Sequence, residues 1–183
     1  GDVYKRQGLT MKPSFLQPLK ITFDEISVKS LEQTEDTILI TPKQFDDWKG
    51  IFFSGLHNYQ IIDEEDRTVF KIQLTIEIPE KENDRVAYNL RVTIVGDFAV
   101  INEQGDYSEE ELLDLVIVNG TSILYSTIKE KVAETTSRMR YGPMFMPGLN
   151  FMETRPSVQV AKDREEGVSR KKTSAKKTVT KNT

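Results

Sequence analysis

The stretch FKIQLTIEIPEKENDRVAYNLRVTI, residues 70–94, decides the fold. Large apolar side chains alternate with mostly polar ones in both of its halves, at 70–78 and 86–94. A period of two is typical of strands that have one dry face and one wet face. The polar residues 79–84 between the halves predict a turn. The stretch therefore predicts a long antiparallel β-hairpin.

Strand patterns also lie on either side of this hairpin. Apolar residues alternate over 19–28, and their phase slips at Asp24-Glu25, which predicts a strand with a β-bulge. Gly96 is expected to break or bulge the second hairpin strand, so that 97–101 forms a short further strand.

The region 32–66 gives a weaker pattern. Residues 37–41 have strand composition, and Pro42 is expected to end that strand. Residues 45–56 mix aromatic, charged and small side chains without a period. They are expected to form a partly buried excursion from the sheet.

A helix is expected to follow residue 107. Ser108 and Glu111 have the spacing of a capping box. Residues 112–118 are apolar nearly all round, which predicts a buried first segment. Asn119-Gly120 is expected to interrupt the helix, and Gly142-Pro143 follows its end. The sequence thus predicts an α+β fold in which a sheet packs with a long, interrupted C-terminal helix.

The segment after this helix, GPMFMPGLNFM at 142–152, is unusual because connecting loops are normally polar. Its large apolar side chains either complete the core or form a pliable apolar surface that binds other chains. We predict the second outcome for the set, as client-binding residues: Met144, Phe145, Met146, Leu149, Phe151 and Met152.

Composition narrows the class of protein. Hydrophobic residues make up 37% of the 183 residues, below the roughly 45–50% of typical globular domains. The chain has no cysteine, which excludes disulfides and thiolate metal sites and fits a reducing compartment. No run of 18 apolar residues is present, so no membrane insertion is expected.

Charge divides the chain unevenly. Residues 162–183 hold eight Lys/Arg and three Asp/Glu, a net charge of +5, whereas the rest carries −9. This tail lacks aromatic residues that stack on bases, so nucleic acid is not an expected partner. We expect a leader at 1–13 that is disordered or non-native, a folded domain at 14–156 and a disordered basic tail at 157–183.

Catalytic signals are weak. His57 is the only histidine, and a lone histidine without a patterned neighbour is more often structural than catalytic. The acids Asp63–Asp66 lack the spacing of a calcium loop and are expected to form a solvated turn. No phosphate-binding glycine motif occurs. The sequence predicts no metal site, cofactor or catalytic residue, and an enzyme of another class stays open as the least favoured alternative.

The order of these elements resembles the SecB export-chaperone family. The segments that carry the resemblance are GDFAV at 96–100, YSEEEL at 107–112, VNGTSILY at 118–125 and MPGLNF at 146–151. It extends over roughly 19–152.

The resemblance implies a four-stranded antiparallel sheet with a long helix and a homo-oligomer, as a dimer or a dimer of dimers. It also implies a cytoplasmic, ATP-independent holdase that binds non-native polypeptides in apolar grooves without a cofactor. From the apolar helix we expect these oligomer-interface residues: Leu112, Leu113, Val116, Ile117, Leu124 and Ile128.

Several positions depart from the family. Typical members dock the export motor SecA through acids on the outer face of the sheet. Glu25 matches one such acid, whereas Lys29 and Arg91 stand where acids are expected, so docking on SecA is in doubt. No periodic pattern follows Pro156, where members have a short helix. The alternative is a dedicated-partner chaperone or adaptor, specific for an antitoxin or of phage or mobile-element origin.

Overall fold

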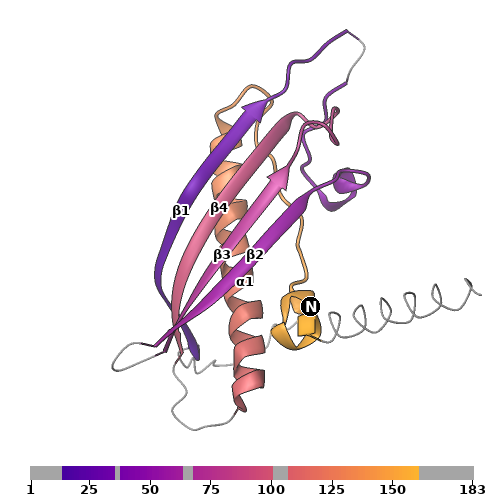
Figure 1. Cartoon of the computed structure of the whole chain (residues 1–183). Coiled ribbons are helices and arrows are strands. Elements are labelled where there is room, and N and C mark those ends of the chain that lie inside the picture. Colours follow the sequence, from indigo (N-terminus) through magenta and orange to yellow (C-terminus); the bar gives the residue numbers. More distant parts are fainter. Residues whose placement is uncertain (1–13, 36–37, 64–67, 101–106, 161–183) are drawn as a thin grey trace, which may run out of the picture.

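The structure, a computed structural model, describes residues 14–35, 38–63, 68–100 and 107–160. One sheet is packed against one long helix, which crosses its inner face (Figure 1). The elements in chain order are β1 Leu16–Ser30, 3₁₀ helix η1 Phe45–Trp48, β2 Ser54–Asp63, β3 Thr68–Ile78, β4 Tyr88–Val100, α1 Glu109–Ser137 and 3₁₀ helix η2 Met152–Thr154.

The four strands form an antiparallel sheet in the order β1-β4-β3-β2. The predicted hairpin is confirmed, because β3 pairs with β4 in a register that places Phe70 opposite Phe98 and Ile78 opposite Leu90. Its inward side chains are almost completely buried beneath α1. The alternation in the sequence therefore marks the face that packs on the helix.

Strand β4 continues through Gly96, so the expected break and separate strand at 97–101 are wrong. A Cβ atom at Gly96 would lie 2.6 Å from the Phe98 ring and 2.8 Å from Leu124 of α1. The glycine is needed for the close approach of helix and strand, and the backbone pairing does not change there.

The bulge predicted in β1 is confirmed by a shift in its register with β4 between Phe23 and Glu25. A second shift lies between Pro18 and Lys20, where the sequence pattern did not indicate one. Each extra residue lets β1 bend with the twisted sheet while apolar side chains stay on one face.

Strand β2 was not predicted, and the strand expected at 37–41 is wrong for the residues described. Ile40 forms only an isolated bridge with Val86. β2 lies at the rim of the sheet and pairs with β3 alone. Because an edge strand is covered less than a central one, its sequence has no need of strict alternation. Residues 64–66 of the expected acidic turn lie outside the described residues.

Helix α1 is continuous, so the interruption expected at Asn119-Gly120 is wrong. The Asn119 side chain donates to the carbonyl oxygen of Leu115 over 2.7 Å, within the helix. A Cβ atom at Gly120 would collide with Ile72 of β3. The predicted capping box is confirmed, since Ser108 accepts from the Glu111 amide and the Glu111 carboxylate accepts from the Ser108 amide.

Most of the predicted oligomer-interface residues lie in the core of the single chain. Leu112 and Leu113 are half-buried and remain candidates. The others are 0% exposed, which corrects the prediction for Val116, Ile117, Leu124 and Ile128. They were misassigned because the inner faces of β1, β3 and β4 pack on α1 and cover more of its apolar surface than the sequence pattern indicated. α1 is also long and apolar enough to cross a membrane, a property that core helices of folded domains share.

The chain stays ordered beyond the expected domain end at Pro156. Residues 156–160 are helical, with proline at the first position, where its missing N–H costs nothing. The Ser157 amide and hydroxyl both donate to the Asp114 carboxylate of α1. The leader at 1–13 and the tail from 161 lie outside the described residues.

Candidate functional site

The direction of the chain after α1 is set by a buried tyrosine. The Tyr88 hydroxyl of β4 accepts from the Tyr141 amide and donates to the Gly142 carbonyl oxygen, both over 2.9 Å. Tyr88 is 0% exposed, and its burial raises the pKa of the phenol. Gly142 has a φ of +78°, a left-handed conformation that favours glycine. Helix and sheet together therefore fix where the following segment begins.

Residues 142–160, called the return segment below, run back along α1. The Met144 amide donates to Thr136 over 2.9 Å near the end of the helix. Further along, the Tyr125 hydroxyl donates to the Pro147 carbonyl oxygen over 2.7 Å. The contact of Ser157 with Asp114 then lies near the start of the helix. The segment is thus held at successive turns of α1.

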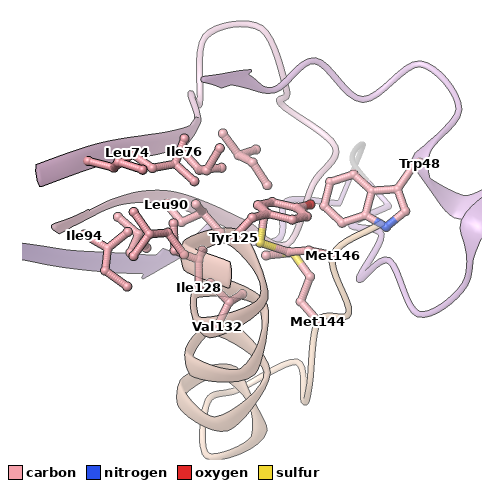
Figure 2. Packing of buried hydrophobic residues seen from close by; sticks show 14 of the residues in the cluster. Trp48, Leu74, Ile76, Leu90, Ile94, Tyr125, Ile128, Val132, Met144 and Met146 are labelled. Carbon is pink, nitrogen blue, oxygen red and sulfur yellow. The ribbon is translucent and has the colours of Figure 1, made fainter. Parts of the chain in front are cut away.

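Side chains of the return segment alternate between core and solvent. Met144 is 0% exposed and Met146 is 4% exposed, whereas Phe145 between them is 49% exposed. Figure 2 shows both methionines in the cluster of core residues. An extended chain that lies on the protein turns alternate side chains inward. The prediction that Met144 and Met146 form a client-binding surface is therefore wrong.

Phe145 is held by its backbone from the segment that precedes β2. Its amide donates to the Pro42 carbonyl oxygen, and its carbonyl oxygen accepts from the Trp48 indole, both over 3.0 Å. Trp48 is buried and packs edge-on against Phe53, with ring centroids 5.7 Å apart. The excursion expected at 45–56 thus anchors the return segment and leaves the Phe145 ring outside.

The remaining predicted client-binding residues differ in exposure. Met152 is 46% exposed, and Leu149 and Phe151 are half-buried. The Phe151 ring packs edge-on against Tyr125, with centroids 5.4 Å apart. The client-binding role of these three residues stays a prediction.

Sequence reasoning missed apolar side chains on and beside β2. Tyr59 and Ile61 pair with residues of the inward face of β3, whereas Leu56 lies opposite Thr75 on the outer face. Phe52, just before β2, is exposed as well. These four residues and two residues of the return segment form what we call the exposed apolar set, whose members are each between 41% and 60% exposed: Phe52, Leu56, Tyr59, Ile61, Phe145 and Met152. An assignment of β2 from its β-branched and aromatic residues would have found three of them.

On the outer face of the sheet, Arg91 lies between two acids. Its guanidinium contacts Glu25 over 3.2 Å and Glu77 over 3.0 Å, from strands on either side of β4. Lys29 is exposed on the same strand as Glu25. Glu25, the predicted SecA contact, therefore has its charge paired within the chain.

No arrangement for catalysis is evident in the part of the chain that the structure describes. No group of three His, Asp or Glu residues lies close enough there to hold a metal ion. His57 lies on β2 with its ring centroid 6.2 Å from that of Tyr59. Its buried Nε2 has no hydrogen-bond partner, and burial lowers the pKa of the imidazole.

A family model described as "Preprotein translocase subunit SecB" matches residues 57–155. This range runs from β2 through the return segment as far as η2. The chain belongs to the SecB family. A search of curated protein sequences gave no match.

Two solved structures are similar to this SecB-family chain. One is the SecB-like chaperone Rv1957 of Mycobacterium tuberculosis in complex with a ChAD peptide from the HigA1 antitoxin. It has 16% identity and a TM-score of 0.43, over 74% of this chain and 88% of the other. The second is a protein of unknown function from Streptococcus agalactiae, with 13% identity and a TM-score of 0.46, over 73% and 97%.

Proposed function

We propose that this SecB-family protein is a cytoplasmic holdase that binds non-native polypeptides without ATP. The observation that carries the proposal is where its exposed apolar side chains lie. Of the twelve large apolar side chains exposed in the described residues, six lie at 52–61 or 145–152. The second segment is tied to Trp48, four residues before the first, by the hydrogen bond from the Trp48 indole to the Phe145 carbonyl oxygen. Family membership and the absence of a nucleotide-binding motif support the same function.

The expected energetics favour many weak contacts over one anchor. A phenylalanine side chain buries roughly 200 Å², so covering the exposed half of Phe145 contributes about 2.5 kcal/mol. Association costs an estimated 4–15 kcal/mol or more in lost translational and rotational freedom. Burial of one such side chain therefore does not by itself hold a client. A long unfolded client that contacts several such residues, or several subunits, gains affinity through effective concentration.

The proposal includes a homo-oligomer, either a dimer or a dimer of dimers. Leu112, Leu113 and Ile123 of α1 are packed against the core but keep part of their surface exposed. A second subunit that covers them would remove apolar area from water. Sedimentation of a monomer alone at micromolar concentration would contradict this part.

A second candidate is a dedicated-partner chaperone or adaptor that acts outside export. It is favoured by the contacts of Arg91 with Glu25 and Glu77, which leave little unpaired negative charge at that place on the outer face. Capture from a native lysate separates the candidates, because a holdase yields many unfolded chains and a dedicated chaperone yields one stoichiometric partner.

The holdase proposal is tested by suppression of aggregation of an unfolded model client. We expect Phe145→Ser combined with Met152→Ser to weaken suppression while the oligomeric mass stays unchanged. Both side chains are exposed, so their replacement leaves the core intact. Ile38→Ser is the matched control, since Ile38 is 81% exposed but outside the exposed apolar set. Equal suppression by wild type and the double variant would refute the assignment of these residues.

A further inference from the structure

Met152 is the exposed methionine among the residues that the structure describes. The chain has five methionines and no cysteine. Met144 and Met146 are buried in the core, and Met139 is half-buried against it. Met152, by contrast, is 46% exposed. Met11 lies outside the described residues. An oxidant in solution therefore reaches the sulfur of Met152 before the sulfurs of the other three described methionines.

The chemistry of sulfur makes this exposure important. Cysteine and methionine are the side chains that peroxide oxidises most readily, and their accessibility decides which of them react. Because the chain has no cysteine that competes for oxidant, methionine is its redox-sensitive residue type. The other members of the exposed apolar set are phenylalanine, leucine, tyrosine and isoleucine, which contain no sulfur. Met152 is thus the member of this set whose polarity changes on oxidation.

The backbone at Met152 is held without any contribution from the thioether. The Met152 amide donates to Asn150 Oδ1 over 3.0 Å, and the Met152 carbonyl oxygen accepts from Arg155 Nε over 2.9 Å. The neighbouring Phe151 ring packs edge-on against Tyr125 of α1. An oxygen added to the sulfur removes none of these contacts. Oxidation of Met152 is therefore expected to change the surface of the return segment and to leave its path along α1 unchanged.

We propose that Met152 is an oxidation site at which peroxide lowers the affinity of the protein for its clients. This inference rests on the proposed holdase function and names a modification that regulates it. The thioether sulfur attacks one oxygen of hydrogen peroxide, so that an S–O bond forms and the O–O bond breaks. Sulfur loses two electrons, and the rest of the peroxide leaves as water. Methionine sulfoxide reductases reverse the change with a dithiol, which becomes a disulfide while the oxygen leaves as water.

The polarity of the sulfoxide is the reason for the expected loss of affinity. A thioether is apolar and adapts to varied apolar partners, whereas a sulfoxide is polar. A client that covers oxidised Met152 has to remove water from the sulfoxide oxygen, and an apolar client segment offers no hydrogen-bond donor in return. The apolar contact that Met152 makes with the client is then lost. We expect the affinity to become about tenfold weaker.

The buried methionines explain why the site responds before the fold is damaged. A sulfoxide at Met144 or Met146 would place a polar group in the core and destabilise the protein. Burial of these two sulfurs slows their reaction. At low peroxide concentration, oxidation therefore changes the client-binding surface first, and the reductases restore it without refolding of the chain.

Peroxide treatment of the full-length protein tests the proposal. After the peroxide is removed, peptide mass spectrometry measures the sulfoxide at each methionine. A titration then measures affinity for the probe, which is reduced, carboxymethylated α-lactalbumin and stays unfolded. We expect Met152 to be oxidised at least about tenfold faster than Met144 and Met146. Affinity for the probe should fall while the oligomeric mass stays unchanged, and treatment with the reductases and dithiothreitol should restore it.

Two variants assign the effect to a residue. The readout is the ratio of probe affinities before and after peroxide, measured within each protein. Met152→Leu removes the sulfur and keeps an apolar side chain, so we expect peroxide to leave its affinity unchanged. Met139→Leu is the matched control, since Met139 is half-buried against the core, and its ratio should equal that of wild type. An equal loss in Met152→Leu and wild type would assign the effect to another methionine and overturn the inference.

The remaining outcomes are decisive as well. Complete oxidation of Met152 with no loss of probe affinity would overturn the inference and leave the holdase function standing. A change of oligomeric mass or a loss of folded structure on oxidation would place the effect in the fold, which contradicts the proposal. Failure of the probe to bind untreated wild type would refute the holdase function and this inference with it.

Discussion

The indole Nε1 of Trp48 donates a hydrogen bond to the carbonyl oxygen of Phe145, 3.0 Å away and 97 positions later in the chain. This contact joins the segment before β2 to the return segment. It orients Phe145 so that the ring faces solvent while Met144 and Met146 enter the core. The display of Phe145 therefore depends on a buried tryptophan that itself does not reach the surface.

Trp48→Phe tests this relationship. The substitution keeps an aromatic ring but leaves the Phe145 carbonyl without its donor, so we expect a loss of about 1 kcal/mol in the free energy of unfolding. We also expect weaker client binding, because the Phe145 ring is held less firmly. Denaturant unfolding and a client-binding titration measure the two effects. Unchanged stability and binding would show that the hydrogen bond contributes nothing. In wild type, emission from this single tryptophan should change on client binding.

Gly120→Ala is predicted to destabilise the protein, although alanine is the better helix former. Intrinsic propensity favours alanine by about 1 kcal/mol. Against this, the added Cβ would collide with Ile72, and overpacking of a core costs about 1–3 kcal/mol. Because Ile72 is 0% exposed and has little room to move, we expect a net loss in the free energy of unfolding. Asn119→Ala at the neighbouring exposed position is the control, with an expected change below about 1 kcal/mol. A more stable Gly120→Ala protein would contradict this packing argument.

Arg91→Gln should alter partner binding more than stability. The guanidinium and its two acids are each more than a third exposed, so their pairing contributes at most about 1 kcal/mol. Removing Arg91 leaves Glu25 and Glu77 unpaired on the outer face. We expect wild type to bind SecA weakly and the variant to bind it more tightly, with an effect that high salt reduces. Lys49→Gln, which also breaks an exposed pair, is the control. Equal SecA binding by all three proteins would rule out this role for Arg91.

We predict that the protein loses stability in mildly acidic solution because His57 is partly buried. Burial lowers its pKa in the folded state below the ordinary value of 6.5, because the buried ring accepts a proton reluctantly. The unfolded chain therefore binds the proton first as pH falls. Stability from this group is complete above pH 6.5 and declines as pH falls from there towards the folded-state pKa. Thermal unfolding at pH 7.5 and 5.5 should show a smaller difference in His57→Gln than in wild type. If the change in unfolding temperature between the two pH values is the same in both proteins, His57 does not cause the loss of stability.

Features of the fold that depend on neighbours in sequence were predictable. The β3–β4 hairpin follows from alternation on both sides of a polar turn. The Ser108 and Glu111 cap follows from a spacing of three residues, and the β1 bulge from a slip in phase. In each case the physical cause, a period or a local hydrogen bond, lies within a few positions.

The predictions from sequence were wrong where a residue distant in the chain, packed against the position in question, decides the local structure. Gly96 and Gly120 looked like breaks, yet each lies in a regular element because Phe98, Leu124 or Ile72 occupies the space that a Cβ would need. β2 was missed because a strand at the rim needs no alternation. The methionines of the return segment were assigned to the surface because nothing local says which side faces α1.

The sequence alone determined that a hairpin precedes a capped helix, and that an apolar segment follows it, since those signals are short-range. Only the tertiary structure decided that Met144 and Met146 belong to the core while Phe145 stays outside. The reason is that Trp48, Thr136 and Tyr125 hold the backbone of the return segment against α1, and that contact sets which alternate side chains are buried.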